Sequence, residues 1–201
     1  MVKYMEYPLK NIEQYKVILA SNSPRRKQLL EQLGVNFVTR VLKDIDESYP
    51  EDLLAEDVAE YISRKKSAVY CEQMAENELI ITADTVVVCG NEILGKPKNS
   101  IEASNMLHKL SGRTHKVVTG VTIATKEFSK SFSSITEVTF AELSDNEIDY
   151  YVEVYKPFDK AGAYGIQEWI GCVGVSGMNG SYYNVMGLPI FRLYQELKNI
   201  Q

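Results

Sequence analysis

Residues 17–33 have the sequence VILASNSPRRKQLLEQL, which holds a strand, a turn and the start of a helix. Its first four residues are apolar and predict a buried strand, while its leucines have the spacing of one helix face. Between them, Ser23 has a side chain suited to cap the helix, and Pro24 fits the first helical position, where a missing N–H costs nothing. The stretch therefore predicts a strand that runs through a tight polar turn into a helix.

Two arginines, Arg25 and Arg26, stand in the first turn of that helix. A helix N-terminus already carries partial positive charge, so cations are disfavoured there. The free backbone N–H groups, the hydroxyls of Ser21 and Ser23 and two guanidinium groups at one point would suit a polyanion, most simply a chain of phosphates. The alternative is a capped helix with two solvated arginines, and this stretch alone does not decide between them.

Beyond this stretch, strand and helix patterns alternate, and Ser144 and Glu147 have the spacing of a capping box. The expected strands cover residues 35–42, 79–89, 93–94, 116–124 and 131–141, and the expected helices cover residues 51–77, 101–110, 144–154 and a last segment that ends near residue 200. This alternation predicts an α/β fold in which residues 1–201 form a single domain. We expect a mixed central sheet with flanking helices and two lobes around a cleft.

The composition is that of an ordinary globular protein, with 45% hydrophobic and 24% charged residues. A net charge of −5 and a pI near 5.2 argue against nucleic acid as the main partner, so any anion must be bound by a local cluster of cations. No apolar stretch is long enough to span a bilayer, and residues 1–14 lack the apolar centre of a secretory signal. A cytoplasmic location is therefore expected.

Few side chains are available to hold a soft metal ion. His108 and His115 are the only histidines, which argues against a zinc site built on imidazoles. Cys71, Cys89 and Cys172 are odd in number and widely spaced, so we expect buried free thiols rather than disulfides or metal ligands. A bound metal would be held by carboxylate and phosphate oxygens, which suits Mg²⁺ or Mn²⁺.

Asp84 and Thr85 interrupt the most apolar strand of the chain. A lone carboxylate there is costly to desolvate, so it should be paired, bound to a metal or placed where the sheet opens into a cleft. A structural Asp held by backbone amides is the alternative. Four further segments join small residues to cations or amides near the ends of expected elements, and they cover residues 95–98, 112–115, 159–167 and 180–189.

Six segments, in order along the chain, resemble those of the Maf family of nucleoside triphosphate pyrophosphatases. They are LASNSPRR (19–26), ADTVV (83–87), LGKP (94–97), SGRTH (111–115), DKAGAYGIQ (159–167) and GSYYNVMGLP (180–189). The resemblance covers nearly the whole chain. It implies a cytoplasmic homodimer with the fold of the inosine triphosphatase group. It also implies an enzyme that uses a divalent metal to hydrolyse a nucleoside triphosphate to the monophosphate and diphosphate.

The resemblance further implies roles for individual residues. Asp84 matches the proton acceptor of the family and a metal-side carboxylate, and Glu47 matches a second acidic position. The positions linked to substrate specificity are Arg25, Thr85 and Gln167. The cations that contact phosphate are Arg26, Lys66 and Lys96, and two hydroxyls that bind substrate beside them belong to Ser21 and Ser23. The segment that ends in Gln167 resembles the branch that acts on dTTP and UTP. Its side-chain amide offers the donor and acceptor that a pyrimidine edge can satisfy.

Some features depart from the family pattern. The N-terminus is longer than usual, Asn99 stands where an Asp is common, and Ser67 replaces a small apolar residue. Lys66 also has a competitor, because Lys65 lies nearer the centre of the apolar stripe of the expected helix. A lysine at the edge of such a stripe can bury its stem and extend its head into a cleft, and for this reason we favour Lys66.

Two other functions fit the same segments. One is a pyrophosphatase for modified or methylated purine nucleotides, against which the amide of Gln167 argues weakly. The other is a nucleotide-sensing regulator of septum formation that binds without hydrolysis. Asp84 discriminates between that regulator and an enzyme, because a buried carboxylate repels a polyanion unless a metal intervenes, and a sensor has no need of it.

Overall fold

The computed structural model describes residues 7–200. Within that range seven strands form one sheet in the order β2-β1-β3-β5-β6-β7, and β4 pairs with β3 as well. The strands are β1 (Lys16–Leu19), β2 (Phe37–Thr39), β3 (Glu78–Cys89), β4 (Glu92–Leu94), β5 (Thr114–Ala124), β6 (Ser129–Phe140) and β7 (Val175–Asn179). β1 runs parallel to β2 and β3, whereas the other pairings are antiparallel, so the expectation of a mixed sheet is confirmed.

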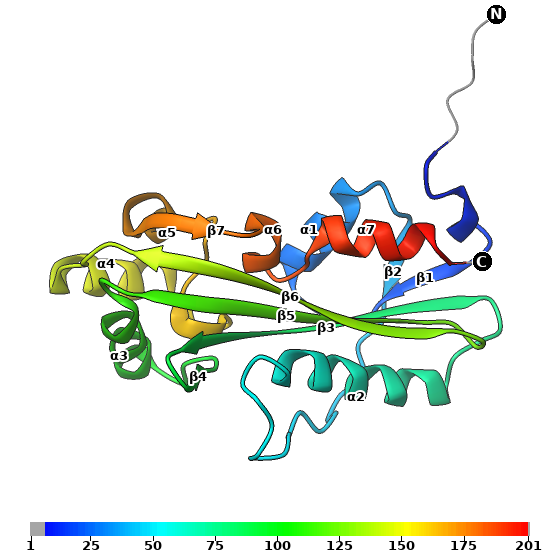
Figure 1. The fold of residues 1–201 in the computed structure, drawn as a ribbon, viewed down its shortest axis with the longest axis horizontal. Coiled ribbons are helices and arrows are strands. Elements are labelled where there is room, and N and C mark those ends of the chain that lie inside the picture. The colour runs from blue at the N-terminus through cyan, green and yellow to red at the C-terminus, as the bar shows by residue number, and fades with distance from the viewer. Residues whose placement is uncertain (1–6, 201) are drawn as a thin grey trace, which may run out of the picture.

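Helices cover both faces of this sheet and gather at one of its ends (Figure 1). Over one face lie α1 (Pro24–Gln32), α6 (Tyr182–Val185) and α7 (Ile190–Lys198), and over the other lies α2 (Val58–Glu72). At the end away from β1 lie α3 (Ser100–Leu110), α4 (Asp145–Tyr155), η2 (Ala161–Ala163) and α5 (Trp169–Gly174), and the short η1 (Lys10–Ile12) precedes β1. No helix in the described part of the chain has the length and apolar character needed to cross a membrane.

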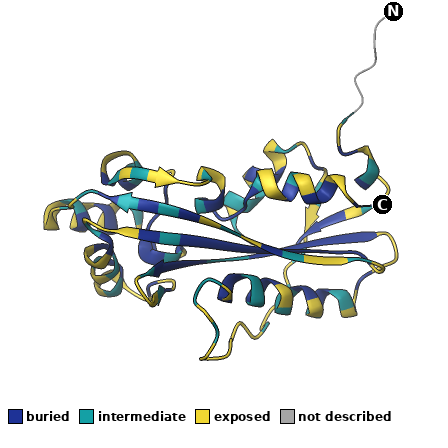
Figure 2. Cartoon of the chain, in the orientation of Figure 1, coloured by how far each residue is buried: buried dark blue, intermediate teal, exposed yellow. Residues whose placement is uncertain are grey.

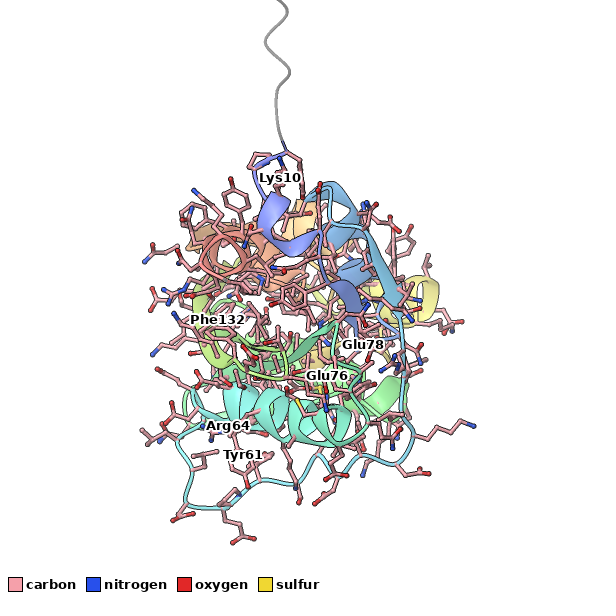
Figure 3. All side chains as sticks on the ribbon, turned by 90° about the vertical axis from the view of Figure 1, so that its right-hand side faces the viewer. Lys10, Tyr61, Arg64, Glu76, Glu78 and Phe132 are labelled. Atoms are coloured by element: carbon pink, nitrogen blue, oxygen red, sulfur yellow. The ribbon has the colours of Figure 1, made fainter. Side chains whose placement is uncertain are left out.

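The core lies between these layers. The long strands β3 and β5 are buried over most of their length, whereas only four of the twelve residues of β6 are buried (Figure 2). Seen from the end of the sheet, Tyr61 and Arg64 mark the α2 layer, and Phe132 lies at the level of the sheet (Figure 3). Because apolar side chains of β3 and β5 are covered on both faces, their sequences are continuous apolar runs rather than alternating patterns.

β3 has a continuous neighbour on one edge only. β5 pairs with it from Ile80 to Val88. On the opposite edge β1 pairs with residues 78–81 and β4 with residues 87–89, so residues 82–86 face no strand there in the described part of the chain. Backbone groups along such a gap need partners from elsewhere. We call this gap the open edge of β3, and it includes Asp84 and Thr85.

Local capping signals correctly predicted two helix starts. Ser23 caps α1, and Pro24 takes its first position. Ser144 and Glu147 form the expected capping box at α4. Asn99, one of the departures from the family pattern, caps α3 through a 2.9 Å hydrogen bond from a backbone N–H in the first turn. Asn and Asp are about equally good at this position, so the departure preserves the local structure.

Two expected elements prove shorter in the structure. The helix expected over 51–77 covers only Val58–Glu72, and the strand expected over 35–42 covers only Phe37–Thr39. Leu54, which fits the apolar stripe of the longer helix, lies in the preceding loop and is 72% exposed, while Leu53 packs against the core from that loop. β2 is short because it is an edge strand that pairs with only three residues of β1.

The three cysteines are free, as expected, but they are not buried. Cys71 and Cys89 are half-buried, and Cys172 is exposed. Cys172 lies on the six-residue helix α5, on the side that faces solvent. The prediction of free thiols is therefore confirmed and the prediction of their burial is wrong.

Candidate active site

The turn between β1 and α1 leads directly to the open edge of β3. Its backbone is fixed by Ser21, whose buried hydroxyl accepts a 3.1 Å hydrogen bond from the N–H of Ser23. The two arginines then leave the first turn of α1 toward different partners. Arg25 forms a 2.9 Å ion pair with Asp159, whereas Arg26 extends to β3. The turn thus places two cations along the gap in the sheet.

Arg26 occupies the place that a strand would otherwise take. Its guanidinium donates to the carbonyl oxygen of Ala83 at 2.9 Å, to that of Gly187 at 2.8 Å and to Oγ1 of Thr85 at 3.0 Å. Burial lowers the pKa of Arg26 below its ordinary value, and the charge of Asp84 acts in the opposite direction. Because most of its donors are used by the protein, Arg26 fixes the open edge of β3 and has little hydrogen-bonding capacity left for a ligand.

Lys66 joins the two acidic residues that the sequence singles out. Its Nζ lies 2.8 Å from Oδ1 of Asp84 and 2.9 Å from Oε1 of Glu47. The side chains of Lys66 and Asp84 are 14% and 16% exposed, whereas Glu47 comes from an exposed loop. Lys65 instead pairs with Asp46, outside the cleft. Of the two lysines, the one at the edge of the helix stripe, Lys66, is therefore the one that contacts Asp84.

Thr85 follows Asp84 on β3, so its side chain points to the opposite face of the sheet. Its hydroxyl lies 3.0 Å from that of Thr119, which donates to the carbonyl oxygen of Asn184 at 3.0 Å. Asn184 is fully buried and donates to the carbonyl oxygen of Val117 at 3.0 Å. This network fixes the segment that ends in Gly187, whose positive φ of 108° suits glycine.

Two loops complete the site from the end of the sheet where β4 lies. The loop after η2 carries Gln167, and the loop after β4 carries Lys96; both side chains are exposed. The loops are joined by a 3.1 Å hydrogen bond from the N–H of Gly162 to the carbonyl oxygen of Gly95. Within residues 7–200, neither Lys96 nor Gln167 has a hydrogen bond or ion pair of its own. Both side chains are thus available to a ligand.

The ten predicted site residues line two adjoining pockets. Three of them line the first pocket alone, namely Asp84, Thr85 and Gln167. The second holds Ser21 and Glu47. The other five predicted residues line both pockets, and they are Ser23, Arg25, Arg26, Lys66 and Lys96. Cations shared by two pockets suit an elongated ligand with its negative charge in the middle.

The sequence assigns no role to several residues that the fold brings to this site. Asp159 and Lys160 line the first pocket, and Lys160 also pairs with Glu168 at 3.1 Å. Behind the pocket wall, buried His115 lies 2.8 Å from the hydroxyl of Tyr164, and burial lowers the pKa of His115 to about 4. In the sequence, these residues are marked only by a charge pair beside glycines and by a single histidine. Neither pattern is specific for a functional site.

The site has a donor set that suits a hard divalent cation bound together with a substrate. Asp84 and Glu47 face the same ammonium group of Lys66. No cluster of three or more Asp, Glu, His or Cys side chains in residues 7–200 could hold a metal without further ligands. Mg²⁺ is commonly bound through one or two carboxylates plus substrate phosphates, and the pair fits that pattern.

Fold and site together define an α/β protein with a cleft at the open edge of its central sheet, lined by both cations and carboxylates. The chain belongs to the Maf family, since the family described as Maf-like protein matches residues 16–200. The match begins at β1 and ends after α7, so it includes every element that contributes to the cleft.

Close relatives cover nearly the same length. A dTTP/UTP pyrophosphatase of Phocaeicola vulgatus is 58% identical over 96% of this chain and 100% of its own. A dTTP/UTP pyrophosphatase of Bacteroides thetaiotaomicron is 54% identical over the same shares of the two chains. Among solved structures, a HAM1 protein from Coxiella burnetii covers 90% of this chain and 99% of its own at a TM-score of 0.45 and 13% identity. That likeness is too low to support a conclusion.

Proposed function

We propose that the protein hydrolyses dTTP and UTP to the nucleoside monophosphate and diphosphate. The observation that carries the proposal is the position of Asp84, a mostly buried carboxylate among cations at the open edge of β3. A pure binding site for a polyanion has no need of that carboxylate. The relatives that share more than half of their residues with this chain are named for the same activity.

The chemistry needs a water molecule, a held phosphate chain and a place for charge to develop. Asp84 orients the water and takes its proton as the oxygen attacks the α-phosphorus, while the bond from that phosphorus to the bridging oxygen breaks and diphosphate leaves. Lys66 holds the Asp84 carboxylate in place and, with Arg25 and Lys96, neutralises the phosphates. Each of these side chains lines the first pocket.

A divalent cation, Mg²⁺ or Mn²⁺, would be held by Asp84 and Glu47. When bound, it supplies positive charge next to the phosphates and lowers the pKa of a bound water. Lys66 lies between the two carboxylates in this structure, and its ammonium group holds both of them by direct ion pairs. The side chains of the cleft would contact the phosphate chain and accept the proton, and the cation would add the positive charge that they lack.

Selectivity for the base would come from the first pocket. Gln167 is exposed at its rim and offers a donor and an acceptor to a uracil or thymine edge. Thr85 and Arg25, the other two positions that the resemblance links to specificity, line the same pocket. The cations that would bind the phosphates line this pocket as well, so the base and the phosphates can be bound at the same time.

The experiment that tests this function is diphosphate release from a panel of nucleoside triphosphates with Mg²⁺ or Mn²⁺. We expect kcat/KM for dTTP and UTP to exceed that for ATP and GTP by at least about tenfold, as for a site that hydrogen-bonds one class of base. Chromatography should find the monophosphate and diphosphate as products. Release of orthophosphate, or no hydrolysis of any nucleotide, would contradict the proposal. Preference for modified purine nucleotides would move the protein to another branch of the family.

We also propose that the protein is a cytoplasmic homodimer whose residues 1–201 form a single domain. The continuity of the sheet from β2 to β7 supports the single domain. Exposed apolar side chains on α5, β7 and α6 offer a surface for a second copy, and they belong to Val173, Met178, Tyr182 and Tyr183. Light scattering on the purified chain tests the dimer, and a mass equal to one chain would exclude it at that concentration.

A further inference from the structure

Asp159 is a carboxylate that stands among the cations of the cleft without a role in the chemistry described above. It lies on the loop between α4 and η2 and lines both pockets. Its Oδ2 accepts from Arg25 at 2.9 Å and its Oδ1 accepts from Lys160 at 2.7 Å. Arg25 comes from α1, so this ion pair joins two elements that are 134 positions apart in the sequence.

The two partners of Asp159 differ in how firmly they are held. Lys160 is buried and has a second partner, Glu168, at 3.1 Å. Glu168 in turn accepts a hydrogen bond from the hydroxyl of Tyr151, which also accepts from the N–H of Gly165 at 3.0 Å. Lys160 is thus anchored within the protein. Arg25 is not, because its only described partner is Asp159.

This asymmetry lets one contact of Asp159 break while the other stays. If Arg25 moves to a ligand, Lys160 still compensates the charge of Asp159 and holds its carboxylate in place. Burial would raise the pKa of Asp159, but hydrogen bonds from Lys160 and Arg25 hold it below its ordinary value, so the residue is charged near neutral pH. A half-exposed ion pair of this kind is weak and can exchange its anion readily.

We propose that Asp159 masks Arg25 in the ligand-free protein and that the phosphates of the nucleotide replace it on the guanidinium. Asp159 thereby sets the affinity of the cleft for phosphate chains, including the diphosphate that the reaction releases. The inference rests on the proposed function only in taking Arg25 as a phosphate-binding residue. A masked cation weakens the binding of the product together with that of the substrate, which favours product release.

The test is the binding of inorganic diphosphate to the full chain, measured by titration calorimetry with Mg²⁺ and again with EDTA. We expect Asp159→Asn to lower the dissociation constant at least about fivefold in both conditions, because Arg25 no longer exchanges partners. Glu92→Gln is the matched control, because it removes the carboxylate of another ion pair. Glu92 lies 2.6 Å from Nζ of Lys109, and neither residue lines either pocket. Its constant should stay within about twofold of the original.

A double-mutant cycle decides whether Asp159 acts through Arg25. In an Arg25→Gln background, Asp159→Asn should have no effect on diphosphate binding. An unchanged or weaker affinity in Asp159→Asn alone would overturn the proposal, and a loss seen only with Mg²⁺ would make Asp159 a metal ligand instead. Asp159→Ser replaces the variant if Asn prevents folding. Binding is measured without turnover, so a protein that binds as expected but hydrolyses no nucleotide would contradict the proposed function alone.

Discussion

At the scale of single residues, Asp84 shows how the sequence could locate the carboxylate to which we assign the chemistry. A carboxylate in a continuous apolar strand predicts a paired or functional residue, and the structure places it beside Lys66 at 2.8 Å. The sequence could not identify Asp159 as part of the site, because an Asp-Lys pair in a glycine-rich loop is equally typical of a solvent-exposed loop without a function. Only the fold brings that loop opposite Arg25.

We predict that Asp84→Asn lowers kcat on the best substrate at least about a hundredfold while the protein stays folded, because the amide can accept from Lys66 but cannot take a proton. Steady-state kinetics and thermal unfolding measure the two parts. Asp46→Asn is the matched control, since Asp46 pairs with the neighbouring Lys65 at 2.6 Å and lines neither pocket. A near-normal kcat in Asp84→Asn would make Asp84 a structural residue.

Gln167 gives a prediction about selectivity. We expect Gln167→Glu to reduce the ratio of kcat/KM between UTP and GTP more than it reduces kcat on UTP, because the acid lacks the amide donor that a pyrimidine carbonyl needs. Kinetics on the two nucleotides measure both quantities. An unchanged ratio with a large loss of kcat would place Gln167 in the chemistry instead of in base recognition.

His115 predicts how stability depends on pH. Burial lowers its pKa to about 4, against about 6.5 in an unfolded chain, so the unfolded state binds the extra proton between these values. This contribution to stability is complete above about pH 6.5 and is lost as the pH falls toward 4, by about 2 kcal/mol between pH 7 and pH 5.

The measurement for His115 is urea unfolding at several pH values, compared between the original protein and His115→Gln. The comparison is needed because His108 acts in the opposite direction: the hydrogen bonds that its ring donates to the backbone carbonyl of Ser104 and to the Asp145 carboxylate raise its pKa, so its contribution is lost as the pH rises. That contribution cancels in the difference between the two proteins. Equal pH slopes for both would show that folding does not shift the pKa of His115.

At the scale of elements, the contact between α2 and β5 decides whether Lys66 reaches Asp84. Gly120 pairs with Asp84 across the sheet, and a Cβ on Gly120 would lie 2.2 Å from the backbone nitrogen of Glu60. α2 therefore packs its backbone directly on the strand at the level of Asp84. The capping signals and the apolar runs predicted most elements, but no local pattern in the sequence indicates this close approach.

We predict that Gly120→Ala lowers the free energy of unfolding by about 3 kcal/mol or more, since backbone and not a flexible side chain must move. In the protein that still folds, displacement of α2 should also lower kcat. Gly177→Ala is the control: it lies on β7, and its nearest neighbour for a Cβ is a Thr139 side-chain atom at 3.6 Å. Urea unfolding should find this variant within about 0.5 kcal/mol of the original.

At the scale of the whole molecule, the balance of charge shows why cations alone are not enough for the proposed reaction. The chain has a net charge of −5. The residues that line the two pockets include five cations and four carboxylates, and they are Arg25, Arg26, Lys66, Lys96 and Lys160 with Asp44, Glu47, Asp84 and Asp159. The cleft is thus close to neutral before a ligand binds. A triphosphate carries several negative charges, which this balance leaves largely uncompensated.

We therefore predict that activity depends on a divalent cation. Treatment with EDTA should lower kcat at least about a hundredfold, and Mg²⁺ or Mn²⁺ should restore it, because the cation supplies the positive charge that the cleft lacks. The unfolding midpoint should not change on EDTA treatment, because residues 7–200 contain no cluster of three or more acidic, His or Cys side chains to bind a structural metal. Full activity in EDTA would mean that the cations released from internal ion pairs, Arg25 first among them, suffice to neutralise the phosphates.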